Sequence, residues 1–165
     1  DLNPILSSLE KVKLNIIQGL KNVNDLERNI KEDKPDVLII DYVQLMMALK
    51  DEYEPDLYEV VKRLKTIAIE NNILVIALSQ LNRNLEYRGG DKRPMIDDLR
   101  GTGALEEFAD KVIMLYRPEY YDITEDCEGN STIGLLEAEL ILNKTGPREM
   151  FGFKINDSFT KVHSI

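Results

Sequence analysis

The fold of this chain is decided by the stretch Pro35-Asp36-Val37-Leu38-Ile39-Ile40-Asp41-Tyr42-Val43-Gln44-Leu45-Met46. Four apolar residues stand in a row before Asp41, a pattern that predicts a short strand buried on both faces. An Asp at the carboxyl end of such a strand lies where open α/β sheets bind their ligands. We therefore expect Asp41 to belong to a ligand site.

The position of Asp41 matches a Walker B pattern, in which the carboxylate holds the Mg²⁺ that bridges the β- and γ-phosphates of a nucleotide. A strand-ending Asp can also serve only as a helix cap, and the pattern by itself leaves both roles open. The sequence contains no G-x-x-x-x-G-K-[ST], the loop that cradles phosphates. We expect the back half of an ATP-driven machine, with no ATPase activity in this chain alone.

Composition indicates an ordinary globular protein. The 165 residues suit one domain, with 43% apolar and 31% charged residues. The apolar runs are too short to cross a bilayer, and residues 1–4 lack the features of a signal peptide. The single Cys127 can form neither an internal disulfide nor a cysteine metal site. We expect a cytoplasmic protein without membrane contact.

The formal net charge of −9 argues against nucleic acid wrapping the whole surface. A local basic groove remains open, because five basic residues fall within 18 positions that also carry acids. On charge alone, a solvated loop is the simpler interpretation of this segment. The five residues are Arg83, Arg88, Lys92, Arg93 and Arg100.

Hydrophobic periodicity predicts buried strands at residues 37–41, 73–78 and 112–116. Between them we expect an amphipathic helix at about 57–68, capped by Asp56 and Glu59, and a short helix at about 104–108. This alternation implies right-handed crossovers and a parallel sheet. Three β-rich segments follow, at 137–143, 149–155 and 159–162, and predict an antiparallel meander at the sheet edge. Residues 14–17 suggest a further short strand, and Asn3-Pro4 suggests the start of a helix.

Three polar residues are candidates for chemistry. Gln80 ends the second strand beside Asp41, where its amide can contact a γ-phosphate or orient water, or simply anchor a loop. Arg100 lies next to glycines in a loop that can grip a phosphodiester backbone, although a salt bridge to a neighbouring Asp would also explain it. Lys144 lies at a hairpin tip that can reach a neighbouring subunit's nucleotide or be an ordinary turn.

Together these segments resemble the replicative DNA helicases of the DnaB family, in their RecA-like motor domain. The resemblance covers roughly residues 14–165 and is strongest at 36–121. Several motifs in the right order are hard to obtain by chance. The matching stretches are LIIDYVQLM, VIALSQLNRNLEYRGGDKRPMIDDLRGTGALEEFADKVIMLYRPEYY and AELILNKTGP.

The resemblance implies roles by position. Asp41 matches the family's Walker B Asp, and Gln80 matches the Gln that senses the γ-phosphate. Arg100, Gly101 and Gly103 match the family's central-channel loop, which grips the backbone of single-stranded DNA, and the family's Glu at the position of Gly101 is absent. The candidates for DNA contact are Arg83, Arg93, Arg100, Gly101 and Gly103.

Two departures from the family pattern stand out. Aligned on Gly146-Pro147, Lys144 occupies the position of the family's arginine finger, where a lysine lacks the bidentate fork. A short deletion would instead leave no finger. The family's phosphate loop and catalytic Glu are also missing, and their strand belongs between the strands ending at Gln80 and Tyr116. We expect a central gap in the parallel sheet, with unpaired backbone groups at its edges.

The sequence thus predicts an α/β, RecA-like P-loop NTPase fragment, a single partial domain over residues 1–165. The implied function is part of the motor of a hexameric replicative DNA helicase that moves on single-stranded DNA and unwinds duplex DNA. Its implied cofactors are ATP and Mg²⁺, and its partners are single-stranded DNA, its own copies in a homo-hexamer, primase and a helicase loader. There are two alternatives: another RecA-like ATPase, of the recombinase or clock type, or a non-enzymatic truncated interaction module.

Overall fold

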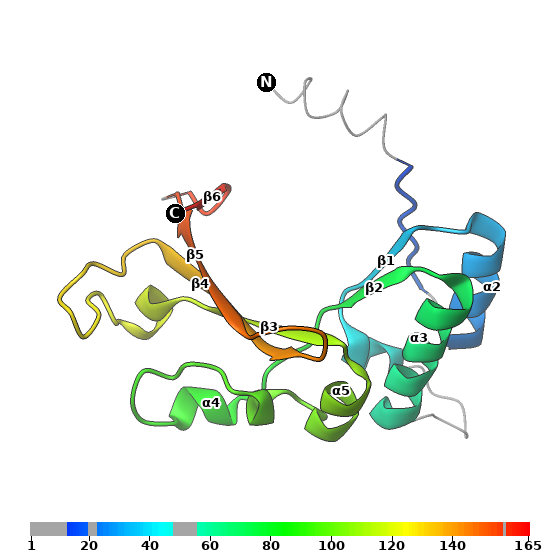
Figure 1. The fold of residues 1–165 in the computed structure, drawn as a ribbon, viewed down its shortest axis with the longest axis horizontal. Helices are drawn as coiled ribbons and strands as arrows, with labels where there is room; N and C mark the ends of the chain where they lie inside the picture. The colour runs from blue at the N-terminus through cyan, green and yellow to red at the C-terminus, as the bar shows by residue number, and fades with distance from the viewer. Residues whose placement is uncertain (1–12, 20–22, 48–55, 157) are drawn as a thin grey trace.

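The structure is a computed structural model that describes residues 13–19, 23–47, 56–156 and 158–165 (Figure 1). The helices are α2 (Val23–Asp33), α3 (Leu57–Asn71), α4 (Asn84–Tyr87) and α5 (Thr102–Phe108), with 3-10 turns η1 (Val43–Met47), η2 (Ile96–Asp98) and η3 (Pro118–Tyr121). The strands are β1 (Val37–Ile40), β2 (Leu74–Ala77), β3 (Lys111–Tyr116), β4 (Leu135–Asn143), β5 (Glu149–Ile155) and β6 (Val162–Ser164). Within the described ranges, no helix is long and apolar enough to cross a membrane.

Strands β1 and β2 form the expected parallel pair, in register from Val37 opposite Leu74 to Ile40 opposite Ala77. Helix α3 makes the crossover between them. It begins where the Asp56 carboxylate accepts a hydrogen bond from the Glu59 N–H at 3.0 Å, which satisfies one of the free donors of the first turn. The predicted cap and the predicted amphipathic helix are both confirmed.

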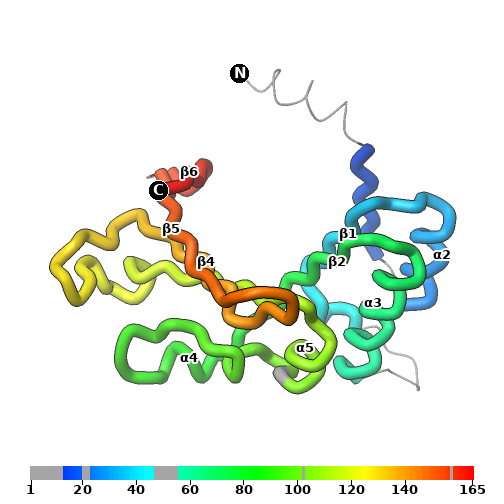
Figure 2. Tube along the Cα trace, in the orientation of Figure 1, coloured from blue at the N-terminus to red at the C-terminus, as the bar shows by residue number. Residues whose placement is uncertain are grey.

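Strands β3 to β6 form a separate antiparallel sheet in the order β3-β4-β5-β6. The predicted meander is therefore confirmed, although its last strand is Val162–Ser164 rather than 159–162. Strand β3 pairs with β4 and not with β2, so the described strands form two sheets with the expected gap between β2 and β3. Figure 2 follows the chain from β2 through α4 and α5 before it returns as β3.

The strands are not buried on both faces, contrary to the prediction. Val37 and Ile39 on β1 are 46% and 63% exposed, whereas Ile40 is buried and Leu38 packs against the core. The same alternation continues on β3, where Ile113 is 59% exposed and Met114 is buried. The described helices cover only one face of β1 and β2, so every second apolar side chain remains uncovered.

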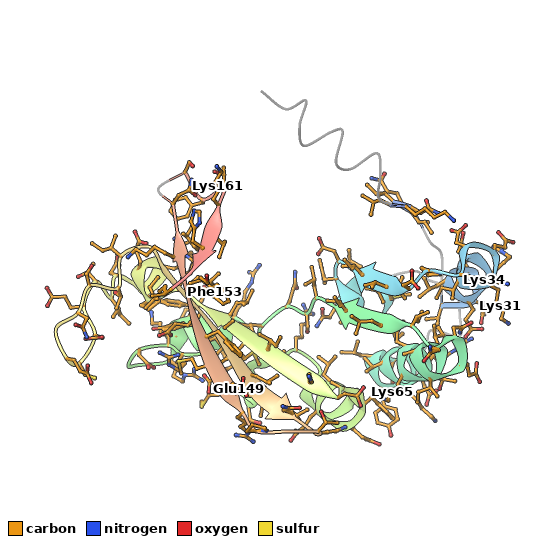
Figure 3. The ribbon with its side chains drawn as sticks, turned by 45° about the horizontal axis from the view of Figure 1, so that its top comes forward. Lys31, Lys34, Lys65, Glu149, Phe153 and Lys161 are labelled. Atoms are coloured by element: carbon orange, nitrogen blue, oxygen red, sulfur yellow. The ribbon has the colours of Figure 1, made fainter. Side chains whose placement is uncertain are left out.

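One cluster of buried apolar side chains joins the two sheets. Helix α3 supplies the centre of this cluster, and Met114 of β3 and Ile141 of β4 close it from the meander side. In Figure 3, Lys65 marks the α3 side, and Glu149 and Phe153 mark β5 in the meander. This core fixes the positions of the loops that follow β1 and β2. Its members on α3 are Leu57, Val60, Val61, Leu64 and Ile67.

Residues 14–17 do not form the predicted strand, because residues 13–19 have no regular secondary structure. Leu14 and Ile16 are 63% and 74% exposed, and no described strand pairs with this segment. An isolated strand leaves its backbone donors and acceptors without partners, so an apolar pattern alone does not form one. The helix start predicted at residues 3–4 lies outside the described residues.

Candidate functional site

Asp41 follows β1 directly and lies at the edge of the parallel pair. The Leu78 N–H donates to the Ile40 carbonyl oxygen, and the Val43 N–H donates to the Leu78 carbonyl oxygen, each at 2.9 Å. These bonds hold the chain on both sides of Asp41 against the segment that follows β2. The carboxylate is exposed, and among the described residues it has no hydrogen-bond or ion-pair partner. It is therefore available to a ligand.

Gln80 lies two residues beyond Leu78, at the same edge. Its backbone is fixed on both sides: its N–H donates to Gln44 Oε1 at 3.3 Å, and its carbonyl oxygen accepts from the Arg100 N–H at 3.2 Å. Its side chain is exposed and forms no bond within the part of the chain that the structure describes. The structure thus brings Asp41 and Gln80 to one edge of the sheet, as the strand order predicted.

Gln44 is a site residue that the sequence reasoning did not single out. It lies in η1 and is only 6% exposed. Its Nε2 donates to Ser79 Oγ at 2.8 Å and to the Arg100 carbonyl oxygen at 3.1 Å, while its Oε1 accepts from the Gln80 N–H. The only sequence signal for Gln44 is its polarity within the apolar run that follows Asp41, and this signal does not identify its hydrogen-bond partners.

The basic segment runs alongside the chain that follows Gln80. Leu81 and Leu99 form an antiparallel bridge, and the Asn82 N–H donates to the Asp98 carbonyl oxygen at 2.6 Å. This pairing places Arg100 beside Gln80, the candidate for contact with a γ-phosphate. The Arg100 side chain is exposed and, within the described ranges, makes no hydrogen bond or ion pair. Arg83 is exposed in the same way at the start of α4.

Asp98 pairs with Arg88 instead of Arg100, which leaves the salt-bridge alternative for Arg100 without support. Arg88 Nη1 lies 2.9 Å from Asp98 Oδ2, and Asp98 also accepts from the Met95 N–H at 2.7 Å. Asp98 is 9% exposed, so these partners stabilise a carboxylate that has lost most of its water. The pair closes the loop on which Arg100 is presented.

Arg93 is held within the fold. Its Nη1 lies 2.7 Å from Glu137 Oε2 and forms an ion pair with it. The contact is not aligned as a hydrogen bond, and neither atom has another hydrogen-bond partner among the described residues. Its guanidinium carbon also lies 4.7 Å from the centroid of the Tyr116 ring. Burial acts to lower the pKa of Arg93, but Glu137 and Asp91 outweigh it and the pKa is raised. The side chain therefore anchors the loop against β3 and β4.

Burial also raises the pKa of the Tyr116 hydroxyl, and the charge of Asp91 adds to this effect. The same hydroxyl donates a hydrogen bond to the Asp91 carbonyl oxygen. Tyr116 stacks on Tyr121, with ring centroids 5.9 Å apart and an interplanar angle of 20°. These rings pack on the protein and hold residues 91–93 in place.

Gly101 and Gly103 differ in their surroundings. Gly101 has a φ of +87°, and a Cβ there would lie 2.0 Å from Leu57 Cδ2 on α3. Position 101 thus requires glycine both for its backbone conformation and for its space. Gly103 lies in α5, and a Cβ there would meet no atom within 4 Å. Both glycines follow Arg100 at an exposed surface.

Lys144 lies in the turn between β4 and β5, as predicted, but its ammonium already has a partner. Its Nζ donates to the Glu107 carbonyl oxygen at 2.5 Å, at the end of α5, and its N–H donates to the Asp110 carbonyl oxygen at 3.0 Å. The side chain remains exposed. To reach a nucleotide on another subunit, Lys144 would have to give up the bond to Glu107.

The donors around Asp41 fit Mg²⁺ better than a metal enclosed by protein. No group of three or more His, Cys, Asp or Glu residues in the described ranges could hold a metal ion. Mg²⁺ usually binds through one or two carboxylates together with phosphate oxygens and waters. The single exposed carboxylate of Asp41, at the sheet edge that it shares with Gln80, matches that requirement.

The model of the DnaB-like helicase C terminal domain matches residues 3–164. This chain belongs to the DnaB-like helicase C-terminal domain family. It is 40% identical over 128 residues to a probable replicative DNA helicase of Trieres chinensis, and this match covers 76% of this chain and 28% of that protein. It is 37% identical over 133 residues to the replicative DNA helicase DnaB of Haemophilus influenzae, covering 78% of this chain and 27% of that protein.

Solved structures agree with the family and with the fold. A DnaB-like replicative helicase, described with its interactions with primase, matches 99% of this chain and 40% of its own, with 28% identity and a TM-score of 0.85. A second solved structure, an ATPase domain, matches 99% of this chain and 59% of its own, with 28% identity and a TM-score of 0.84. The predicted family and the predicted α/β, RecA-like fragment are both confirmed. The chain spans about a quarter of the length of the curated relatives it matches.

Proposed function

We propose that residues 1–165 are a single partial motor domain, from the Walker B strand to the end of the chain, of a hexameric replicative DNA helicase. The complete protein would use ATP and Mg²⁺ to move along single-stranded DNA and unwind duplex DNA. The observation that carries the proposal is the meeting of Asp41 and Gln80 at one sheet edge, with Arg100 bonded to the Gln80 backbone. Family membership supports the same assignment.

In this proposal Asp41 would hold the magnesium ion, and the Gln80 amide would contact the γ-phosphate or orient the attacking water. Mg²⁺, when bound, neutralises charge on the phosphate oxygens. The contribution of this chain is positioning, because the backbones beside both side chains are fixed by hydrogen bonds while the side chains stay exposed. The phosphate loop and catalytic Glu would come from another part of the complete protein.

The proposed DNA contact uses Arg100 and Arg83 together with the backbone at Gly101 and Gly103. Both arginines are exposed, and neither has a side-chain partner within the described residues. Arg93 contributes by anchoring the loop, because its guanidinium is already paired with Glu137. A net charge of −9 suits a protein that holds DNA only along one local groove.

The homo-hexamer and its partners also belong to the proposal. Lys144 would serve as the cation that reaches the ATP of the next subunit, after leaving the Glu107 carbonyl. Primase and a helicase loader are the proposed protein partners, and the cytoplasm is the proposed location. The solved structure of a related helicase with primase supports the first of these partners.

The test is ATP hydrolysis and strand separation by the complete protein that contains this chain. The wild type should hydrolyse ATP faster when single-stranded DNA is present, and Asp41→Asn should lower turnover roughly 100-fold or more, because metal charge stabilisation is worth several kcal/mol. Asp122→Asn, at an exposed residue directly after η3, is the matched control and should behave as wild type. Normal turnover in folded Asp41→Asn would reduce Asp41 to a structural residue, and no turnover in the wild type would favour a non-enzymatic module.

A further inference from the structure

Gln44 forms the only described side-chain link that touches both the Gln80 and the Arg100 backbones. Gln44 is 6% exposed, and its amide bonds to the segment that follows β2 and to the end of the basic segment. Three hydrogen bonds use both ends of the amide, which is most of what a glutamine side chain can form. A buried amide that is satisfied in this way fixes the relative positions of its partners.

The two residues held by Gln44 share an arrangement. Each has its backbone bonded and its side chain exposed. The bond between the Arg100 N–H and the Gln80 carbonyl oxygen closes a ring of contacts through Gln44. A shift of the Gln80 backbone therefore changes the position of the Arg100 backbone through two routes, one direct and one through the Gln44 amide.

We propose that Gln44 is a positioning residue that couples the nucleotide state read at Gln80 to the DNA grip of Arg100. This inference rests on the proposed function and deepens it, because it identifies the group that connects the two proposed contacts. Gln44 touches neither nucleotide nor DNA. Its amide transmits a displacement because a hydrogen-bonded network of this kind keeps a few discrete arrangements rather than deforming continuously.

The test measures how strongly nucleotide changes single-stranded DNA affinity in the complete protein. The probe is a fluorescent oligothymidylate, titrated with a non-hydrolysable ATP analogue or with ADP. The ratio of the two dissociation constants is the readout, since site-to-site coupling typically gives roughly 5- to 150-fold ratios. Gln44→Met should bring the ratio close to one, because it keeps the length of the side chain and removes all three hydrogen bonds.

A merely structural role for Gln44 would weaken DNA binding in both nucleotide states and leave the ratio unchanged. Thr132→Val is the matched control: Thr132 is buried, its hydroxyl donates to the Ile123 carbonyl oxygen, and it lies outside this network. If Gln44→Met does not fold, Ser79→Ala removes the bond from Gln44 Nε2 to the half-buried Ser79 and the 3.4 Å bond from Ser79 Oγ to the Gln80 carbonyl oxygen. It leaves the other two Gln44 bonds in place and should lower the ratio partly.

The outcomes separate the two proposals. A wild type that binds no single-stranded DNA or hydrolyses no ATP overturns the proposed function. A wild type with a ratio above one, together with a folded Gln44→Met or Ser79→Ala variant that keeps the full ratio, overturns only the coupling role of Gln44. A wild-type ratio of one also overturns the coupling role of Gln44. If that wild type still binds single-stranded DNA and hydrolyses ATP, the proposed function stands.

Discussion

The backbone N–H of Arg100 donates a 3.2 Å hydrogen bond to the carbonyl oxygen of Gln80. These residues are far apart in sequence, yet the antiparallel pairing of Leu81 with Leu99 makes them direct neighbours. A candidate for sensing a nucleotide and a candidate for gripping DNA are thus joined without an intervening side chain.

Arg100→Ala, in the assembled complete protein, should weaken binding of single-stranded DNA about equally for all sequences. Phosphate contacts carry no base information, so affinity should fall without a change in preference. The log–log dependence on salt should also become shallower by roughly one unit for each lost phosphate contact. Fluorescence anisotropy titrations at several salt concentrations measure both quantities.

Arg28→Ala is the control for Arg100→Ala, because Arg28 is an exposed arginine on α2 that pairs with Asp25. It should change neither affinity nor slope. If Arg100→Ala gives the same curves as Arg28→Ala, the basic loop is not the DNA grip.

Gly101→Ala should lower the free energy of unfolding by roughly 1–3 kcal/mol, through backbone strain and overpacking. The φ of +87° disfavours any residue with a Cβ, and that Cβ would lie 2.0 Å from Leu57 Cδ2. Gly103→Ala is the control, since a Cβ has open space there and alanine favours a helix by about 1 kcal/mol. Urea unfolding of both variants checks the contrast, and equal stabilities would show that position 101 tolerates a side chain.

Asp98→Ala should lower the free energy of unfolding by about 1.5–3 kcal/mol, the range for hydrogen bonds that involve charged groups. The change removes the ion pair with Arg88 and leaves the Met95 N–H without its acceptor. Asp97→Ala, at the exposed neighbouring residue, should stay within about 0.5 kcal/mol of wild type. Hydrogen exchange of residues 88–100 should increase in the first variant alone, and unchanged exchange would mean that the pair does not hold the loop.

Acid should loosen the turn at Asp126. Its pKa is lowered, first because the Asn130 side chain donates to the carboxylate at 3.0 Å and then because backbone N–H groups do so. A carboxylate with a depressed pKa contributes stability above its unfolded pKa and loses it as pH falls through the folded pKa. An NMR titration of the Asp126 carboxyl group measures its pKa in the folded protein directly.

Asn130→Ala should bring the pKa of Asp126 back toward its ordinary value, because it removes the largest cause of the shift. Glu128→Gln provides the comparison, since only the backbone N–H of Glu128 donates to Asp126. An Asp126 titration that is the same in Asn130→Ala and wild type would rule out this hydrogen bond as the cause.

The sequence was sufficient for the elements whose causes are local. The apolar run before Asp41 predicted β1, the Asp56 and Glu59 pair predicted the start of α3, and both are found. The order of strands and helices then predicted that Asp41 and Gln80 share a sheet edge, because parallel strands place their carboxyl ends together. The DnaB-like motifs predicted the family, which the matched residues 3–164 confirm.

The tertiary structure alone decided which polar groups meet. Gln44 bonds to partners 35, 36 and 56 residues away, and no local pattern encodes such distances. In the same way, only the packing of the loop on β4 pairs Arg93 with Glu137 and leaves the Arg100 side chain without a partner among the described residues. The exposed faces of β1 and β3 follow from the same cause: a periodic pattern shows which residues can be buried, but burial itself requires another part of a protein to cover them.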